Sequence, residues 1–145
     1  ADVIFLLDAS DSITPENFET LKYFIALMIK GMEISPVFIR VGIIPYGTQP
    51  LEEFVIPLKS YNVDILLYRM LKSIKQNSAL AITETAAAIR RMREMFADSM
   101  RDGVVQIGIA ITDGLSYSPS VTKDEAKIAH DSCIQMIAIG VGDRT

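Results

Sequence analysis

The sequence has very few of the side chains that build disulfides, zinc sites and catalytic triads. Its one cysteine, Cys133, excludes an internal disulfide, and its one histidine, His130, has no companion for a zinc site or a Ser-His-Asp triad. No apolar run is long enough to cross a bilayer, and no glycine-rich phosphate cradle occurs. The net charge of −4 gives no support to nucleic acid or an anionic membrane as a partner. No basic segment precedes the first apolar run, as a signal peptide would require, although a piece of a longer polypeptide would lack one too.

What is present is an alternation of strand-like apolar runs with segments of helical spacing. Of the 145 residues, 50% are hydrophobic, which suits one globular domain with a sheet covered on both faces. We expect strands over residues 3–7, 40–44, 51–56, 104–112 and 134–141, and helices over 15–30, 62–74, 85–96 and 123–130. The short turn at 47–50 requires the strands on either side of it to be antiparallel. Pro45 suggests that the second strand ends or kinks there.

This order predicts a doubly wound, Rossmann-like α/β domain. Its sheet would be mainly parallel with one antiparallel edge strand, and helices would cover both faces. Because the last strand has no helix after it to cover it, we expect a further C-terminal strand and helix beyond Thr145. Residues 1–145 are therefore interpreted as a single domain cut from a larger protein.

The sequence pattern also predicts which side chains are buried and which are exposed to solvent. The residues expected to face the core are Phe18, Leu21, Phe24, Ile25, Met28 and Ile29 in the first helix, Ile65, Leu66, Met70 and Ile74 in the second, and Ile89, Met92 and Phe96 in the third. Arg90, Arg91 and Arg93 are expected on a solvated helix face. Cys133 is expected to be a small buried residue, and His130 to lie near a helix C-terminus, where positive charge is favourable.

The most informative segment is the turn Asp8-Ala9-Ser10-Asp11-Ser12. It follows the apolar run 3–7, and it precedes Thr14-Pro15-Glu16, which carries the cap, proline and acid typical of a helix start. In open α/β sheets, ligands bind at such strand-to-helix turns. The turn offers a carboxylate and two hydroxyl groups, which are hard oxygen ligands that suit Mg²⁺, with Mn²⁺ or Ca²⁺ as alternatives.

Two further strand-end regions should converge on this turn. One is Ile82-Thr83-Glu84-Thr85 and the other ends in Asp113, so this edge of the sheet would offer the two carboxylates of Asp8 and Asp113 and several hydroxyl groups. Because hydroxyl ligands bring no charge, a cation held this way would be under-neutralised and would attract an outside carboxylate, which favours adhesion over hydrolysis. The alternatives are a helix-capping turn without metal and an N-cap role for Thr83. Asp11 and Glu84 are interpreted as solvated neighbours of the site.

These three pieces together resemble a von Willebrand factor type A domain. The D-x-S-x-S after the first strand, the threonine before the mid-chain helix and the T-D-G after a later strand match that family in order across the whole chain. In the family they form a metal-ion-dependent adhesion site, in which Ser10, Ser12 and Thr83 would supply hydroxyl ligands. Asp8 and Asp113 would then bind the metal directly or through water. The chain departs from the family pattern at Ala79-Leu80-Ala81-Ile82, where many members have glycines, and at Pro45.

The stretches 40–47 and 134–142 are most similar to the N-terminal modules of collagen VI α3-like chains, with matrilin modules next. This resemblance implies a secreted, non-enzymatic module of the extracellular matrix with neighbouring modules of the same kind. Its partners would be matrix proteins or cell-surface receptors, engaged through an acidic side chain, with no nucleic acid and no membrane insertion.

Three other hypotheses stay open at this point. The domain could be a structural matrix module with a weak or empty metal site, or an intracellular scaffold domain of the same family. The third is an enzyme, because a strand ending in aspartate with a later T-D-G distantly resembles Mg²⁺-dependent phosphatases. Those enzymes need a second aspartate two residues after the nucleophile, and this chain has Ser10 there. We therefore disfavour catalysis.

Overall fold

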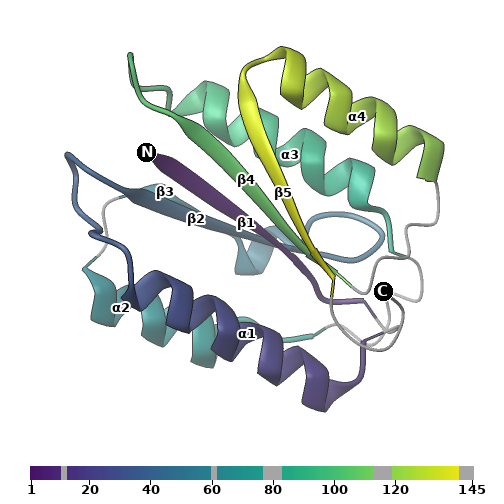
Figure 1. Cartoon of the computed structure of the whole chain (residues 1–145). Helices are drawn as coiled ribbons and strands as arrows, with labels where there is room; N and C mark the ends of the chain where they lie inside the picture. Colours follow the sequence, from purple (N-terminus) through teal and green to yellow (C-terminus); the bar gives the residue numbers. More distant parts are fainter. Residues whose placement is uncertain (11–12, 60–61, 77–82, 113–118, 141–145) are drawn as a thin grey trace.

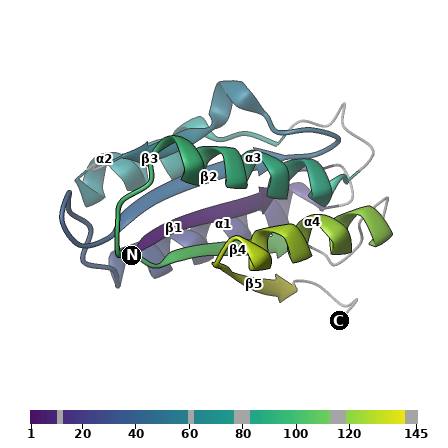
Figure 2. The same ribbon diagram turned by 90° about the horizontal axis from the view of Figure 1, so that it is seen from above.

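The computed structural model describes residues 1–10, 13–59, 62–76, 83–112 and 119–140. Their elements are β1 (Asp2–Asp8), α1 (Pro15–Lys30), β2 (Arg40–Tyr46), a 3₁₀ turn (Glu52–Phe54), β3 (Ile56–Lys59), α2 (Val63–Tyr68), a π-helical turn (Arg69–Ser73), α3 (Thr85–Asp98), β4 (Gln106–Thr112), α4 (Pro119–Asp131) and β5 (Ile134–Gly140). The strand order is β3-β2-β1-β4-β5. All pairs are parallel except β2 with β3. Helices α1 and α2 cover one face of the sheet and α3 and α4 the other, as Figures 1 and 2 show. The predicted fold class is confirmed.

Strand β1 forms the centre of the domain because both of its faces are apolar. Val3, Phe5 and Leu7 belong to the core cluster under α1 and α2, whereas Ile4 and Leu6 belong to the cluster under α3 and α4. Every residue of β1 is buried. Burying one large apolar side chain contributes roughly 1.5–3 kcal/mol, so this strand fixes the position of the turn that follows it.

Two strand predictions were wrong. β2 continues through Pro45, which lies opposite Leu7 in the parallel pairing with β1. Its pairing with β3 stops at Ile43 opposite Ile56, so no β3 residue pairs with the proline, which lacks an N–H to donate. β3 begins at Ile56 and not at Leu51, because the segment before it forms a 3₁₀ turn whose glutamates are exposed.

Two helix predictions also need correction. Phe24 is 42% exposed and Ile65 is 50% exposed, whereas Lys22, which apolar periodicity cannot select, is only 3% exposed. α1 turns Phe18, Leu21 and Ile25 to the core and leaves Phe24 on its flank. α2 is only six residues long and buries a single side chain, Leu66.

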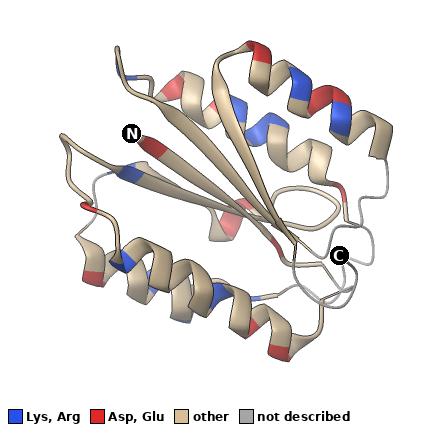
Figure 3. Ribbon diagram, in the orientation of Figure 1, with Lys and Arg blue, Asp and Glu red and all other residues tan. Residues whose placement is uncertain are grey.

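The region after α3 corrects two further expectations. Cys133 is exposed and has a φ of 65°, because it lies in the turn that leads from α4 into β5. The arginines of α3 are not simply solvated: Arg93 and Arg90 form ion pairs of 2.7 Å and 2.9 Å with Glu125 of α4. Figure 3 shows that both of these helices carry charged segments. Arg91 pairs with Glu52 at 2.8 Å. His130 lies in the last turn of α4, as expected.

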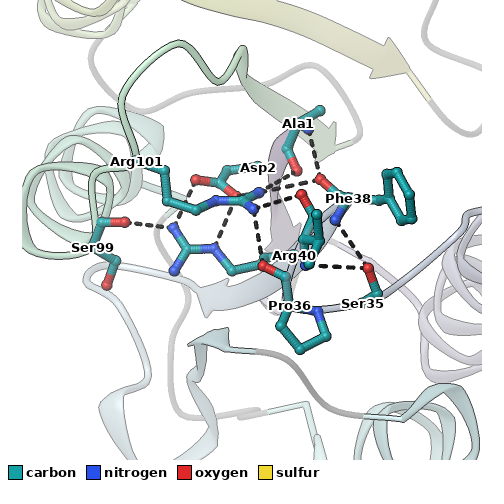
Figure 4. A network of polar contacts seen from close by, with 9 residues as sticks. Ala1, Asp2, Ser35, Pro36, Phe38, Arg40, Ser99 and Arg101 are labelled. Carbon is teal, nitrogen blue, oxygen red and sulfur yellow. Dashed lines mark hydrogen bonds and ion pairs between the residues drawn. The ribbon is translucent and has the colours of Figure 1, made fainter.

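A buried ion-pair network fixes the amino-terminal end of the sheet (Figure 4). Asp2 is fully buried and accepts hydrogen bonds from Arg40 Nε at 3.0 Å, Arg40 Nη2 at 2.8 Å and Arg101 Nη2 at 2.6 Å. Burial alone would raise the pKa of Asp2, but the hydrogen bonds and charges of the two arginines outweigh it and hold that pKa below its ordinary value. Arg101 also donates to the carbonyl groups of Ala1 and Phe38. This network ties the start of β1 to segments about forty and one hundred residues away.

Within the described ranges, no helix combines the length and the apolar character that a membrane span requires.

Candidate metal centre

The candidate site begins at Asp8, the last residue of β1. Its Oδ1 accepts hydrogen bonds from the Ser10 backbone N–H at 2.9 Å and from Ser10 Oγ at 2.6 Å. Its Oδ2 accepts one from Thr112 Oγ1, at the end of β4, at 2.7 Å. Asp8 and Ser10 are both fully buried. The carboxylate therefore joins its own turn to the end of the neighbouring parallel strand.

Thr83 reaches the same cluster from the far side of the sequence. Its Oγ1 lies 2.6 Å from Ser10 Oγ, although 73 positions separate the two residues. The start of α3 is held against the end of β2, because the Glu84 N–H donates to the Gly47 carbonyl at 2.8 Å. The hydroxyl groups of Tyr46 and Thr85 form a second link between these segments, at 3.2 Å. These contacts place Thr83 beside the turn after β1.

The structure thus brings together three of the five side chains that the sequence predicts as ligands: Asp8, Ser10 and Thr83. Ser12 and Asp113 lie outside the described residues, as does Asp11. Glu84 differs from the solvated neighbour that we expected. It is half-buried, and its Oε1 is buried with no hydrogen-bond partner in the described part of the chain.

Two residues of this region were missed by the sequence analysis. Thr112 precedes Asp113 in the T-D-G motif, so the rule that parallel strands end at a common edge applied to it equally well. Gln76 donates from Nε2 to the carbonyl oxygens of Ser10 at 2.8 Å and Ile13 at 2.5 Å. No sequence pattern marks Gln76, because it lies in the segment between the π-helical turn and α3 and belongs to no motif.

The chemistry of the donor set fits a small hard cation. A carboxylate and hydroxyl oxygens are ligands that Mg²⁺, Mn²⁺ and Ca²⁺ accept, and they would not select a soft metal. Among the described residues, no group of three or more His, Cys, Asp or Glu side chains is placed to hold a metal ion. A cation at this edge would therefore depend on Ser and Thr hydroxyl groups for much of its coordination, and these bring no negative charge.

The family model for the von Willebrand factor type A domain matches residues 2–145. The chain is 39% identical over 145 residues to the human collagen alpha-1(XXI) chain, 32% over 146 residues to chicken (Gallus gallus) matrilin-1, and 37% over 146 residues to the mouse collagen alpha-4(VI) chain. These matches cover 98–99% of this chain, but only 14%, 28% and 6% of the respective relatives. The relatives are extracellular matrix proteins, and they confirm the predicted location.

Two solved structures have the same fold. The manganese-loaded TRAP protein of Plasmodium vivax has a TM-score of 0.80 at 21% identity, covering 99% of this chain and 57% of that one. Proximal thread matrix protein 1 from the mussel byssus, with a zinc-occupied MIDAS motif, has a TM-score of 0.83 at 22% identity, covering 97% and 35%. At these identities the likeness concerns the fold alone. With the family model matched over nearly every residue and the sheet order and strand-end cluster described above, this chain is a member of the von Willebrand factor type A domain family.

Proposed function

We propose that the domain is a non-enzymatic adhesion module that binds a divalent cation at the carboxyl edge of its sheet. The ligands would be Asp8, Ser10, Ser12, Thr83 and Asp113, and the cation Mg²⁺, with Mn²⁺ or Ca²⁺ as alternatives. One observation carries the proposal: two segments far apart in the sequence deliver buried oxygen donors to one place, with the Ser10 and Thr83 hydroxyl groups 2.6 Å apart, and Thr112 of β4 joins them through Asp8.

The charge of the donor set argues for adhesion. Three of the five proposed ligands are hydroxyl groups, which bring no charge. Where an aspartate binds through water, the cation would keep part of its positive charge and would attract a carboxylate from a partner. Asp8 orients the serine through its two hydrogen bonds and holds Thr112 with its other oxygen. The residues of this chain would thus keep the donors in place, while the acidic group of a matrix protein or cell-surface receptor completes the coordination.

The known proteins support the metal and the matrix role in different ways. The TRAP structure is manganese-loaded and the mussel structure has a zinc-occupied MIDAS motif, so this fold holds divalent metals in other proteins. The collagen and matrilin relatives support a non-enzymatic role, and they disfavour the intracellular scaffold that the sequence left open. The structural matrix module with a weak or empty site remains the second candidate, because the sequence before Thr83 is Ala79-Leu80-Ala81-Ile82, where many members of the family have glycines.

The small share of each relative that the chain covers supports a modular organisation. We propose that residues 1–145 act as one von Willebrand factor type A module within a longer polypeptide that carries further modules of the same kind. The activity and partners of such a longer polypeptide would then depend on several sites.

The direct test is the thermal unfolding of the domain with chelator and with Mg²⁺ or Mn²⁺. A ligand that binds only the native state stabilises it, by about 1.4 kcal/mol when its concentration exceeds Kd tenfold. Asp113→Ala and Asp8→Asn should remove the metal-dependent shift in Tm, whereas Asp64→Ala, at an exposed position in α2, should keep it. An identical melting curve with and without millimolar metal would refute the metal site and leave the structural module as the function.

The acidic-partner part of the proposal needs a separate measurement. A carboxylate that binds Mn²⁺ at the open side of the site displaces a water molecule from the metal. Acetate should therefore lower the water-proton relaxation enhancement of the Mn²⁺-loaded domain, and acetamide at the same concentration should not. Equal effects of the two compounds would contradict carboxylate recognition.

A further inference from the structure

We propose that Gln76 is a positioning residue of the cation site, an inference that rests on the proposed metal binding. Gln76 comes from the segment between the π-helical turn and α3, more than sixty positions after the turn that it contacts. Its Nε2 donates to the Ser10 carbonyl at 2.8 Å and to the Ile13 carbonyl at 2.5 Å. One amide group thus binds two backbone oxygens of the loop between β1 and α1. In sequence, these oxygens flank Asp11 and the predicted ligand Ser12.

The segment that presents Gln76 is itself anchored to α1. Lys22 of α1 donates from Nζ to the carbonyl oxygens of Leu71 at 3.2 Å and Ile74 at 2.9 Å. The Lys22 side chain is only 4% exposed, and its ammonium group lies 5.3 Å from the centre of the Phe18 ring. The turn after β1 leads directly into α1. The segment 71–76 is therefore attached to α1 through Lys22 and to the turn through Gln76. Gln76 therefore has a defined position relative to Ser10.

The choice of an amide at position 76 suits a cation site. Ser10 gives both its N–H and its Oγ to Asp8, so the orientation of its backbone also sets the position of its hydroxyl group. Gln76 fixes that backbone through the carbonyl oxygen and not through the hydroxyl group that is proposed to bind the metal. A lysine or arginine in its place would bring positive charge toward the cation. A glutamate would face two carbonyl oxygens with no proton to donate.

The test compares Mn²⁺ affinity with basal stability. Gln76→Met keeps the length of the side chain and removes both hydrogen bonds, and Gln76→Asn keeps the amide but is one methylene shorter. Mn²⁺ binding is measured from the free-ion EPR signal, and stability from urea unfolding in chelator. Groups that orient metal ligands from outside the coordination shell typically change affinity 10–100-fold when mutated. We expect Kd to rise roughly tenfold in both variants.

The control is Arg101→Met, at the opposite end of the sheet. It loses the contacts of Arg101 to Asp2 and should destabilise the domain while leaving the Mn²⁺ Kd unchanged. A Kd within about twofold of the parent in Gln76→Met would overturn the positioning role while leaving the metal site intact, and Gln76→Asn decides the question in the same way if Gln76→Met does not fold. A parent domain that binds no Mn²⁺ would instead refute the proposed function on which this inference rests.

Discussion

Replacing Asp2 with asparagine removes a single negative charge, and we expect it to lower the free energy of unfolding strongly. The Asp2 carboxylate is only 1% exposed, and it pairs with Arg40 and Arg101, whose side chains are 15% and 21% exposed. Removing one member of a fully buried ion pair costs about 3–5 kcal/mol. Because water still reaches the arginines and asparagine keeps one acceptor oxygen, we expect a loss of roughly 2–4 kcal/mol in the free energy of unfolding near pH 7.

The pH dependence of that loss follows from the lowered pKa of Asp2. A carboxyl group with a lower pKa in the folded state contributes stability above its unfolded pKa, here about 3.9. The contribution disappears as the pH falls through the folded pKa. The difference in stability between parent and Asp2→Asn should therefore be constant above about pH 5 and shrink as the pH falls below about 4.

Urea unfolding followed by circular dichroism at several pH values measures this difference directly. Asp64→Asn, at an exposed position, serves as the matched control and should change stability by less than about 0.5 kcal/mol. A double-mutant cycle with Arg101→Met should show a coupling free energy of about 0.5–3 kcal/mol. A loss below about 1 kcal/mol at pH 7, or a difference that does not shrink in acid, would refute the assignment of the network as a buried, stabilising ion-pair cluster.

Three further substitutions test other parts of the structure by urea unfolding. Cys133→Gly should stabilise the domain by roughly 0.5–1 kcal/mol, because glycine adopts the left-handed backbone at φ 65° without strain; a destabilised variant would contradict this. Glu125→Gln should cost about 1–2 kcal/mol at neutral pH and less in acid, because two arginines of α3 lower the pKa of this carboxyl against the effect of burial; a loss that persists unchanged at pH 3 would contradict the ion pairs. Lys22→Met should cost about 1–3 kcal/mol by leaving two backbone carbonyl groups without their donor, and an unchanged midpoint would show that those bonds contribute little.

The parts of the fold that depend on local sequence were predicted well. Thr14 caps α1, with its Oγ1 accepting from the Asn17 N–H at 3.2 Å, and Asn62 caps α2 in the same way at 2.8 Å. The apolar runs located β1, β4 and β5 to within a few residues. Capping, helical periodicity and buried runs involve neighbours within four positions, so the sequence carries them directly.

The errors came from contacts between distant segments. Pro45 stays within β2 because the pairing of β2 with β3 ends before it. The sequence of either strand alone does not predict the register between the two strands. Lys22 is buried because two carbonyl groups near the π-helical turn accept its hydrogen bonds. Phe24 and Ile65 are exposed because each helix meets the sheet along a narrower face than its apolar residues suggest.

By itself, the sequence determined the α/β class, the oxygen-rich turn after β1 and the family resemblance, because each depends on residue types at fixed spacing. The tertiary structure decided which donors meet. It placed the Thr83 hydroxyl against Ser10 across 73 positions, joined Thr112 to Asp8 and brought Gln76 to the backbone of the turn. These contacts arise from the parallel register of β1 with β4, from the packing of α3 on β1, and from the packing of the π-helical turn on α1. Burial of the central strand supplies the free energy that holds these polar groups together, and no single segment encodes their arrangement.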